Sequence, residues 1–463
     1  MSRAYLSWPK LTDLSLSQPF NGPVERRGNS LIVFPSERQR LFAVRDFLDP
    51  TKSDAEIESI APRFMKSSGE YSATKTRRLL KGKISFAESN IRSYPFKPFD
   101  VRLAYLDGPI QPLFSRPSPE LLDHARIPGN CFLISRDTAD KTPEGPPFYF
   151  SRAVCDYDCI SGHARHFPLL LREASQNEHN QQPSQGILPL HAKPKDTSPV
   201  LPNLSISASQ YLASIDVAIS GSLSNIASLI WSHVTAIGYS PQYLDDNHDG
   251  IRQDWPRVPL PNTKKALVAS AKLGNNIAAL LDSETPLKDV TGGDLRAELR
   301  LIGMTKRTGG GNLKEADLPL TAGWGHASKD GATMPGNGRL LERQYSPAER
   351  KAIAEGAKEQ GISEKIALTH LGNTTCDVYL NDSAYWSNIP IRVWEYTIGG
   401  YQIIKKWLSY REEPLLGRPL TIDEVRYVQE MARRIAAILL LEPALNANYE
   451  SVKSHTFPWP PKS

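Results

Sequence analysis

The chain has 463 residues, a length that predicts two or three domains because one hydrophobic core seldom organises so many residues. Its net charge of +5 permits a nucleic-acid partner without requiring one. Four cysteines exclude a disulfide scaffold and favour the reducing cytoplasm, and no apolar run reaches the roughly 20 residues that a membrane-spanning helix needs, so we expect no membrane partner.

Residues 1–172 predict a part that mixes strands and helices. Short apolar runs bounded by turn residues at 31–34, 131–134 and 148–150 indicate strands. Ser53-Asp-Ala-Glu56 has the pattern of a capping box, in which two side chains satisfy the free amides at the start of a helix.

The rest of the chain changes composition three times. Residues 173–203 are polar, rich in Gln, Asn, Ser and Pro, and indicate a linker or a long surface loop. Residues 204–290 have helical spacing, and 291–345 hold many glycines and predict an irregular insertion. Residues 346–463 open with a second capping-box pattern and predict a helical C-terminal part. The expected fold class is α+β, with a mixed N-terminal half and a mostly helical C-terminal half.

A basic stretch between Lys75 and Lys83 is the first candidate for contact with nucleic acid. Five of its nine residues are cationic and none is acidic. Lysine and arginine bind DNA by neutralising phosphates and releasing counterions. The alternative is a charged helix face that is simply solvated.

The run Tyr94-Pro-Phe-Lys97-Pro-Phe-Asp100-Val-Arg102 is a second candidate. Its cations could reach DNA, although lysine at position 97 lacks the bidentate fork of arginine. In a purely structural role, Asp100 would pair with Arg102 and Phe99 would lie in the core. Arg116, Asn130 and Arg136 follow downstream as further candidate contacts.

Cys155, Cys159, His163 and His166 have side chains that bind zinc tetrahedrally. Their spacing is looser than that of the usual C-x2-C knuckle, and ordinary buried cysteines with polar surface histidines explain the same residues. Arg165 and the two histidines could equally touch DNA phosphate. We therefore expect no metal.

Residues 393–411 read VWEYTIGGYQIIKKWLSYR and form the most informative stretch of the chain. Its apolar residues predict one packing face, and Gly399-Gly400 would let another backbone approach closely. Lys405 and Lys406 either contact DNA or are solvated. Upstream, a helix and a proline-rich strap at 230–261 predict an architectural element that holds helices in a fixed relation.

Together these motifs resemble the C-terminal target-recognition (specificity) region of the Type ISP restriction-modification enzymes. The resemblance covers nearly the whole chain and is densest at 94–136, 230–261 and 393–445. Full-length members carry a nuclease, a helicase-like motor and an adenine methyltransferase ahead of this region, and the present chain is expected to begin after all three. The resemblance implies a module that clamps duplex DNA beside a methyltransferase core and reads a short asymmetric target.

Catalytic motifs of such enzymes are missing from the sequence. The nearest match to an Asn/Asp-Pro-Pro-Tyr/Phe loop is Gly145-Pro-Pro-Phe148, in which glycine cannot accept hydrogen bonds from a target base. No Walker lysine motif and no glycine-rich turn after a convincing strand are present. We expect no cofactor on this chain, and S-adenosylmethionine only in a partner methyltransferase.

The leading hypothesis is a non-catalytic, sequence-specific DNA-binding module of an adenine-N6 methyltransferase system, with residues 1–172 carrying much of the recognition. One alternative is a divergent or incomplete S-adenosylmethionine-dependent DNA methyltransferase, and another is an assembly subunit of a phage-defence complex that does not bind DNA. The predicted DNA contacts are Lys75, Arg77, Arg78, Lys81, Lys83, Arg92, Lys97, Arg102, Arg116, Asn130, Arg136, Arg152, Arg165, Lys405 and Lys406.

Overall fold

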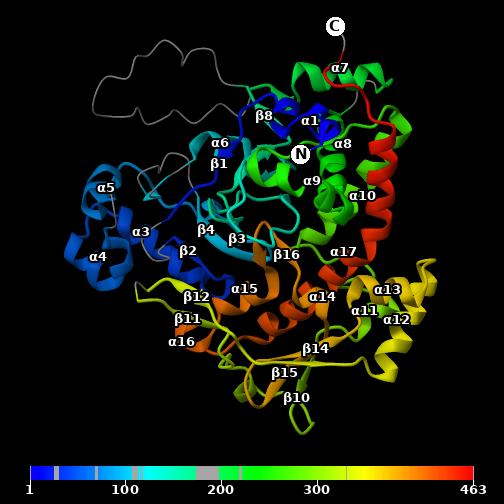
Figure 1. Cartoon of the computed structure of the whole chain (residues 1–463). Helices are drawn as coiled ribbons and strands as arrows, with labels where there is room; N and C mark the ends of the chain where they lie inside the picture. The colour runs from blue at the N-terminus through cyan, green and yellow to red at the C-terminus, as the bar shows by residue number, and fades with distance from the viewer. Residues whose placement is uncertain are drawn as a thin grey trace.

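The fold is that of a computed structural model of the chain, shown in Figure 1. The structure describes residues 2–25, 31–67, 71–106, 113–114, 116, 118–173, 198–217, 222–329 and 331–461.

Two small antiparallel sheets organise the N-terminal part. The elements are α1 (Arg3–Ser7), α2 (Leu11–Leu14), β1 (Phe20–Asn21), β2 (Ile32–Val33), η1 (Pro35–Phe42), α3 (Ala43–Leu48), α4 (Asp54–Ile60), η2 (Pro62–Met65), α5 (Ala73–Leu80), η3 (Glu88–Asn90), β3 (Ile91–Lys97), β4 (Asp100–Tyr105), α6 (Pro119–His124), β5 (Phe132–Ser135), β6 (Tyr149–Ser151), β7 (Arg165–Pro168) and β8 (Leu170–Arg172). One sheet has the order β2-β4-β3 and the other β1-β7-β5-β6. The strands expected at 31–34, 131–134 and 148–150 are confirmed, and so is the capping box at Ser53.

The C-terminal part contains more strand than its composition predicted. The elements are β9 (Val200–Pro202), α7 (Ile206–Ser214), α8 (Leu223–Gly238), α9 (Pro241–Gln253), α10 (Lys264–Leu281), α11 (Ala297–Arg300), β10 (Met304–Arg307), η6 (Glu315–Asp317), β11 (Gly325–Ala327), β12 (Thr333–Pro335), β13 (Leu340–Arg343), α12 (Pro347–Glu359), α13 (Glu364–Leu371), β14 (Thr375–Tyr379), β15 (Ala384–Pro390), α14 (Ile391–Trp394), β16 (Thr397–Ile398), β17 (Tyr401–Gln402), α15 (Ile403–Ser409), α16 (Glu413–Leu416) and α17 (Ile422–Ser454). A sheet of order β10-β15-β14-β13 joins the glycine-rich segment to the later strands. The fold class is α+β, as expected, with several separate small sheets.

The helices α8, α10 and α17 pack together on the side of the molecule opposite α4 and α5 (Figure 1). α8 and α10 approach so closely that a Cβ on Gly274 would lie 1.7 Å from the carbonyl oxygen of Ser232. Only glycine allows this contact, because any side chain would overlap the facing backbone. The Ser346 and Thr421 capping boxes are both present at the starts of α12 and α17.

The described residues at the two ends of the polar segment lie side by side. β8 pairs antiparallel with β9, so that Arg172 faces Val200 and Leu170 faces Pro202. Residues 174–197, most of the expected linker or loop, lie outside the described residues. Because these ends are paired strands, the described residues before and after the segment are adjacent in space.

One cluster of buried apolar side chains extends from Tyr5 to Val452. It includes residues of both halves, such as Trp8, whose ring packs edge-on against Tyr449 of α17 at a centroid distance of 6.4 Å. Within the described residues, none of the helices is both long and apolar enough to cross a lipid bilayer.

Candidate nucleic-acid interface

The hairpin β16/β17 docks the 393–411 motif onto the N-terminal part. Its turn, Gly399-Gly400, has positive φ at both residues, which matches the preference of two-residue hairpin turns for glycine. The Gly399 amide donates to the Pro146 carbonyl at 3.0 Å, and the Ser161 amide donates to the Gly399 carbonyl at 2.8 Å. A Cβ on Gly399 would lie 2.5 Å from Ile160. The expected close approach of another backbone is confirmed.

A buried charge cluster joins the same two parts of the chain. Arg102 of β4 donates to Asp100 at 2.9 Å, and Arg411, which follows α15, donates to the other carboxylate oxygen at 2.7 Å. Burial alone would raise the pKa of Asp100, but the two guanidiniums outweigh it and hold that pKa at about 2. Phe99 is fully buried, so the structural reading of the 94–102 run is confirmed for Phe99, Asp100 and Arg102.

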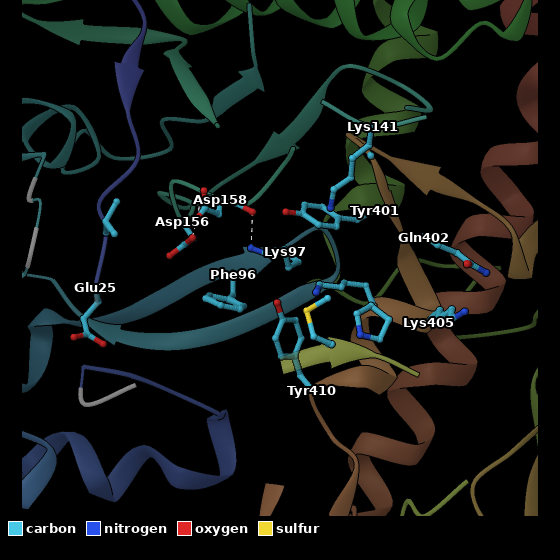
Figure 2. A pocket seen from close by; sticks show the side chains of 15 residues that line it. Glu25, Phe96, Lys97, Lys141, Asp156, Asp158, Tyr401, Gln402, Lys405 and Tyr410 are labelled. Carbon is cyan, nitrogen blue, oxygen red and sulfur yellow. Dashed lines mark hydrogen bonds between the residues drawn. The ribbon is translucent and has the colours of Figure 1, made fainter. Parts of the chain in front are cut away.

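A cavity of about 750 Å³ opens beside this cluster, at the boundary between the two halves (Figure 2). Its size falls within the roughly 300–1,000 Å³ of small-ligand pockets. The walls come from the end of β3, the 136–148 and 152–164 loops, β12, β17 and α15, together with the segment that follows β1. They carry four lysines: Lys97, Lys141, Lys405 and Lys406.

Three of these ammonium groups gather around one aromatic ring. The Nζ atoms of Lys141, Lys97 and Lys406 lie 4.1, 5.3 and 5.6 Å from the centre of the Tyr401 ring. Lys406 also lies 4.6 Å from the ring centre of Tyr410. Contacts of this kind stabilise an ammonium through the negative face of the ring. Figure 2 shows Lys97 and Lys141 on either side of Tyr401, with Tyr410 and Lys405 toward α15.

Lys406 is the cation most affected by this arrangement. Its burial, and then the charges of Lys97 and Lys141, lower its pKa to about 8. Lys97 is itself buried, which lowers its pKa, and it donates to the Asp158 backbone carbonyl (Figure 2). On the side of Lys406, the walls of the cavity therefore carry more positive than negative charge.

The predicted contacts of the basic stretch divide between surface and interior. Lys75, Arg78 and Lys83 are exposed on or just after α5, and Lys81 is half-buried. Arg77 is fully buried and donates to the Asp54 carboxylate at 2.6 Å and to the Asp49 carbonyl at 2.9 Å. Figure 1 shows α5 at the edge of the molecule.

Two other predicted contacts also have internal partners. Arg136 is buried and pairs with Glu144 at 2.7 Å. The Asn130 side chain donates to the His124 and Leu170 carbonyls, each at 2.9 Å, and so ties β5 to β8. Like Arg77 and Arg102, these residues use their polar groups in hydrogen bonds and ion pairs inside the protein. They are therefore not among the proposed DNA contacts. Sequence alone could not separate them from exposed cations because charge patterns do not report burial.

Arg92, Asn130 and Arg152 line one shallow depression of about 590 Å³. Arg126, which lies in none of the sequence motifs, belongs to the same depression. Arg152 is exposed and pairs with Asp282 at 2.7 Å. Arg116 is exposed, and Arg165 is half-buried with its guanidinium 5.5 Å from the Tyr157 ring centre.

Three of the four candidate zinc ligands lie together, because the Cys155 thiol is in hydrogen-bond contact with both Cys159 and His166, but His163 does not join them. His166 accepts a hydrogen bond from the Cys155 amide at 2.9 Å, whereas His163 is exposed and stacks on Tyr157. Burial and the neighbouring Cys155 raise the pKa of Cys159, which keeps it a thiol. In the part of the chain that the structure describes, no group of three or more His, Cys, Asp and Glu side chains could hold a metal ion.

The profile of the family described as Type ISP C-terminal specificity domain matches residues 29–436. The chain belongs to this family. A search of curated proteins finds no match.

Among solved structures, folds similar to this one occur within larger chains. DrdV in the cryoEM structure of its complex with DNA has a TM-score of 0.54 and 12% identity over 96% of this chain and 37% of its own. A nuclease-deletion mutant of the Type ISP restriction-modification enzyme LlaGI, in complex with a DNA substrate mimic, has a TM-score of 0.50 and 13% identity over 97% of this chain and 34% of its own.

The ATP-dependent Type ISP restriction-modification enzyme LlaBIII bound to DNA also has a TM-score of 0.50, with 12% identity over 97% of this chain. This specificity domain thus spans about a third of the DrdV and LlaGI chains, and 25% of the LlaBIII chain. At such low identity these likenesses establish the fold.

Sequence reasoning found Lys97, Lys405 and Lys406 but missed Lys141, Tyr401 and Tyr410 as parts of one cavity. Both tyrosines belong to the 393–411 motif: Tyr401 lies four residues before Lys405, and Tyr410 lies four residues after Lys406. Nothing in the sequence indicates that Lys141 lies opposite them. That juxtaposition depends on the docking of the β16/β17 hairpin against residues 144–146.

Proposed function

We propose that this specificity domain binds double-stranded DNA and recognises a short target sequence. The observation that carries the proposal is the family match over residues 29–436, and the solved chains with a similar fold were determined with DNA or a DNA mimic. The cationic cavity and the exposed arginines and lysines supply the positive charge that phosphate binding requires.

The proposed contacts are those cations that remain accessible. Phosphates would be held by the exposed side of α5, and base edges would be approached from the arginine-lined depression, because arginine pairs bidentately with guanine. The set comprises Lys75, Arg78, Lys81, Lys83, Arg92, Arg116, Arg152, Arg165, Lys405 and Lys406. Lys97 acts from within the cavity wall.

Methyl transfer would belong to a partner protein, an adenine-N6 DNA methyltransferase of a restriction or phage-defence system in the cytoplasm. The missing target-base loop and cofactor turn support this division of labour. S-adenosylmethionine would then bind the partner. Binding of S-adenosylmethionine by the isolated chain would instead favour a divergent methyltransferase.

The test is selection of bound duplexes from a random DNA library by the purified chain at two salt concentrations. We expect enrichment of one short asymmetric motif, with affinity that falls steeply as salt rises. A selection that enriches nothing with the chain alone is repeated with the partner methyltransferase present. Failure in both formats contradicts the proposal and favours a subunit that only assembles partners.

A further inference from the structure

The cavity beside Tyr401 presents lysines that form no ion pair with any described residue of the chain. Lys97 is satisfied, since it donates to the Asp158 carbonyl and faces Asp156. Lys141, Lys405 and Lys406 differ, because within the described parts of the chain their side chains make neither an ion pair nor a hydrogen bond. The ammonium groups of Lys141 and Lys406 lie against tyrosine rings.

Carboxylates in the cavity wall are engaged elsewhere. Asp158 lies 3.1 Å from the exposed His163, and Asp156 accepts from the Tyr94 hydroxyl at 2.8 Å. Glu25 also has an interaction partner. None of these acids forms an ion pair with Lys141 or Lys406, and Asp100, which also acts on Lys406, is shared by Arg102 and Arg411.

This arrangement costs free energy that an anion would recover. Lys406 is half-buried, and burial together with the like charges of Lys97 and Lys141 disfavours its protonated form. A ligand carrying negative charge and several acceptor oxygens could pair with both Lys141 and Lys406, whose ammonium groups lie against the same Tyr401 ring. Phosphate fits this description better than a single carboxylate because it offers more charge and more acceptor oxygens.

We propose that the cavity binds the phosphate of a nucleotide, held between Lys141 and Lys406 with Lys405 at the rim. The cavity of about 750 Å³ is larger than a phosphate group and leaves space for the attached sugar and base beside Tyr410, Met334 and Pro335. Its ligand would be either a nucleotide of bound DNA or a free nucleotide. If the nucleotide belongs to bound DNA, this site rests on the proposed DNA-binding function and extends it.

The experiment compares the intact chain with a K141Q/K406Q variant and with K365Q as a matched control. Lys365 is an exposed lysine of α13 outside the cavity wall. Calorimetric titration measures binding of dAMP and of inorganic pyrophosphate, and fluorescence anisotropy measures binding of a labelled duplex. K141Q alone is included because Lys141 is exposed and its loss leaves the core intact.

We expect saturable binding of at least one phosphate ligand by the native chain and K365Q, and roughly tenfold or greater weakening in K141Q/K406Q. Weakened duplex binding with unchanged dAMP binding assigns the site to DNA, and the reverse assigns it to a free nucleotide. If native and doubly substituted chains bind every ligand equally, the proposal is wrong even where sequence-specific DNA binding persists. If the native chain binds dAMP but no DNA, the nucleotide site stands and the proposed function fails.

Discussion

Asp100 is a buried carboxylate that accepts hydrogen bonds from two guanidiniums, those of Arg102 and Arg411, which lie more than 300 residues apart in the sequence. Arg102 also lies over the Phe96 ring at 3.8 Å and Arg411 over the Trp407 ring at 3.7 Å. Each buried arginine is thus held by the Asp100 carboxylate and by aromatic faces, which fix its position. The cluster locks β4 to the segment that follows α15.

Replacing Asp100 by Asn should destabilise the chain strongly. The two guanidiniums would lose their shared counter-charge, and breaking a buried pair costs about 3–5 kcal/mol. The pKa of Asp100 lies below its usual value, so its contribution is present at neutral pH and is lost as pH falls toward 2. Unfolding free energies from urea titration measure the effect.

Asp382→Asn is the control, because Asp382 pairs with Arg339 but is 97% exposed. A surface pair of this kind contributes about 0–1 kcal/mol. Equal losses of stability in the two variants would contradict the role assigned to the buried cluster.

Lys406 should make phosphate binding depend on pH. Its pKa is about 8, so raising the pH from 7 to 9 removes its charge and weakens binding of an anion in the cavity. Charged groups facing it are Lys97 of β3, Lys141 of the 136–148 loop, and Arg102 and Asp100 of β4. Binding of pyrophosphate measured by calorimetry across this range checks the prediction.

K406R supplies the comparison, since arginine stays charged at pH 9. Its binding should change less over the same range than that of the native chain. Identical pH profiles for the two proteins would show that another group titrates.

At the scale of elements, α5 illustrates how one basic helix serves two purposes. Ser72 caps its start, and its polar face carries Lys75 and Arg78 toward solvent. The opposite face turns Arg77 inward, where it holds the loop before α4 through Asp49 and the first turn of α4 through Asp54.

Substitution of adjacent arginines on α5 should therefore separate binding from stability. R78Q is expected to weaken DNA binding about equally for all sequences and to lower the salt slope of binding by about 1, with little loss of stability. R77Q should lower the unfolding free energy by about 2–4 kcal/mol, less than a fully buried pair because Asp54 is 43% exposed. Anisotropy titrations at several salt concentrations and urea unfolding measure these two effects. An unchanged salt slope in R78Q would remove α5 from the interface.

At the scale of the whole molecule, the two halves share their interior. Tyr427 of α17 donates to the Phe99 carbonyl at 2.7 Å, and Tyr239, which follows α8, donates to the Phe148 carbonyl at 2.9 Å. The boundaries at 172 and 203 describe a change in composition, and the proposed recognition surface spans both sides of them.

Calorimetric unfolding of the chain should show one cooperative transition. A shared core and buried polar links couple the parts, because each would expose apolar surface if the other unfolded. Separate transitions, with one retained after residues 1–203 are removed, would show that the predicted parts fold independently.

Local patterns in the sequence were enough to predict where several helices begin and to which family the chain belongs. The capping boxes at Ser53, Ser346 and Thr421 could be predicted because each depends only on a residue three positions further along the chain. The Gly399-Gly400 turn could be predicted because both of its residues lack a side chain. Tertiary structure alone decided which cations face solvent. Arg77 and Arg78 are chemically alike neighbours, yet one is buried and the other exposed. The same holds for the cavity, which exists because Lys141 and Tyr401, distant in sequence, meet where the hairpin docks. Burial and long-range juxtaposition depend on the packed chain as a whole, and a local pattern of residues does not contain them.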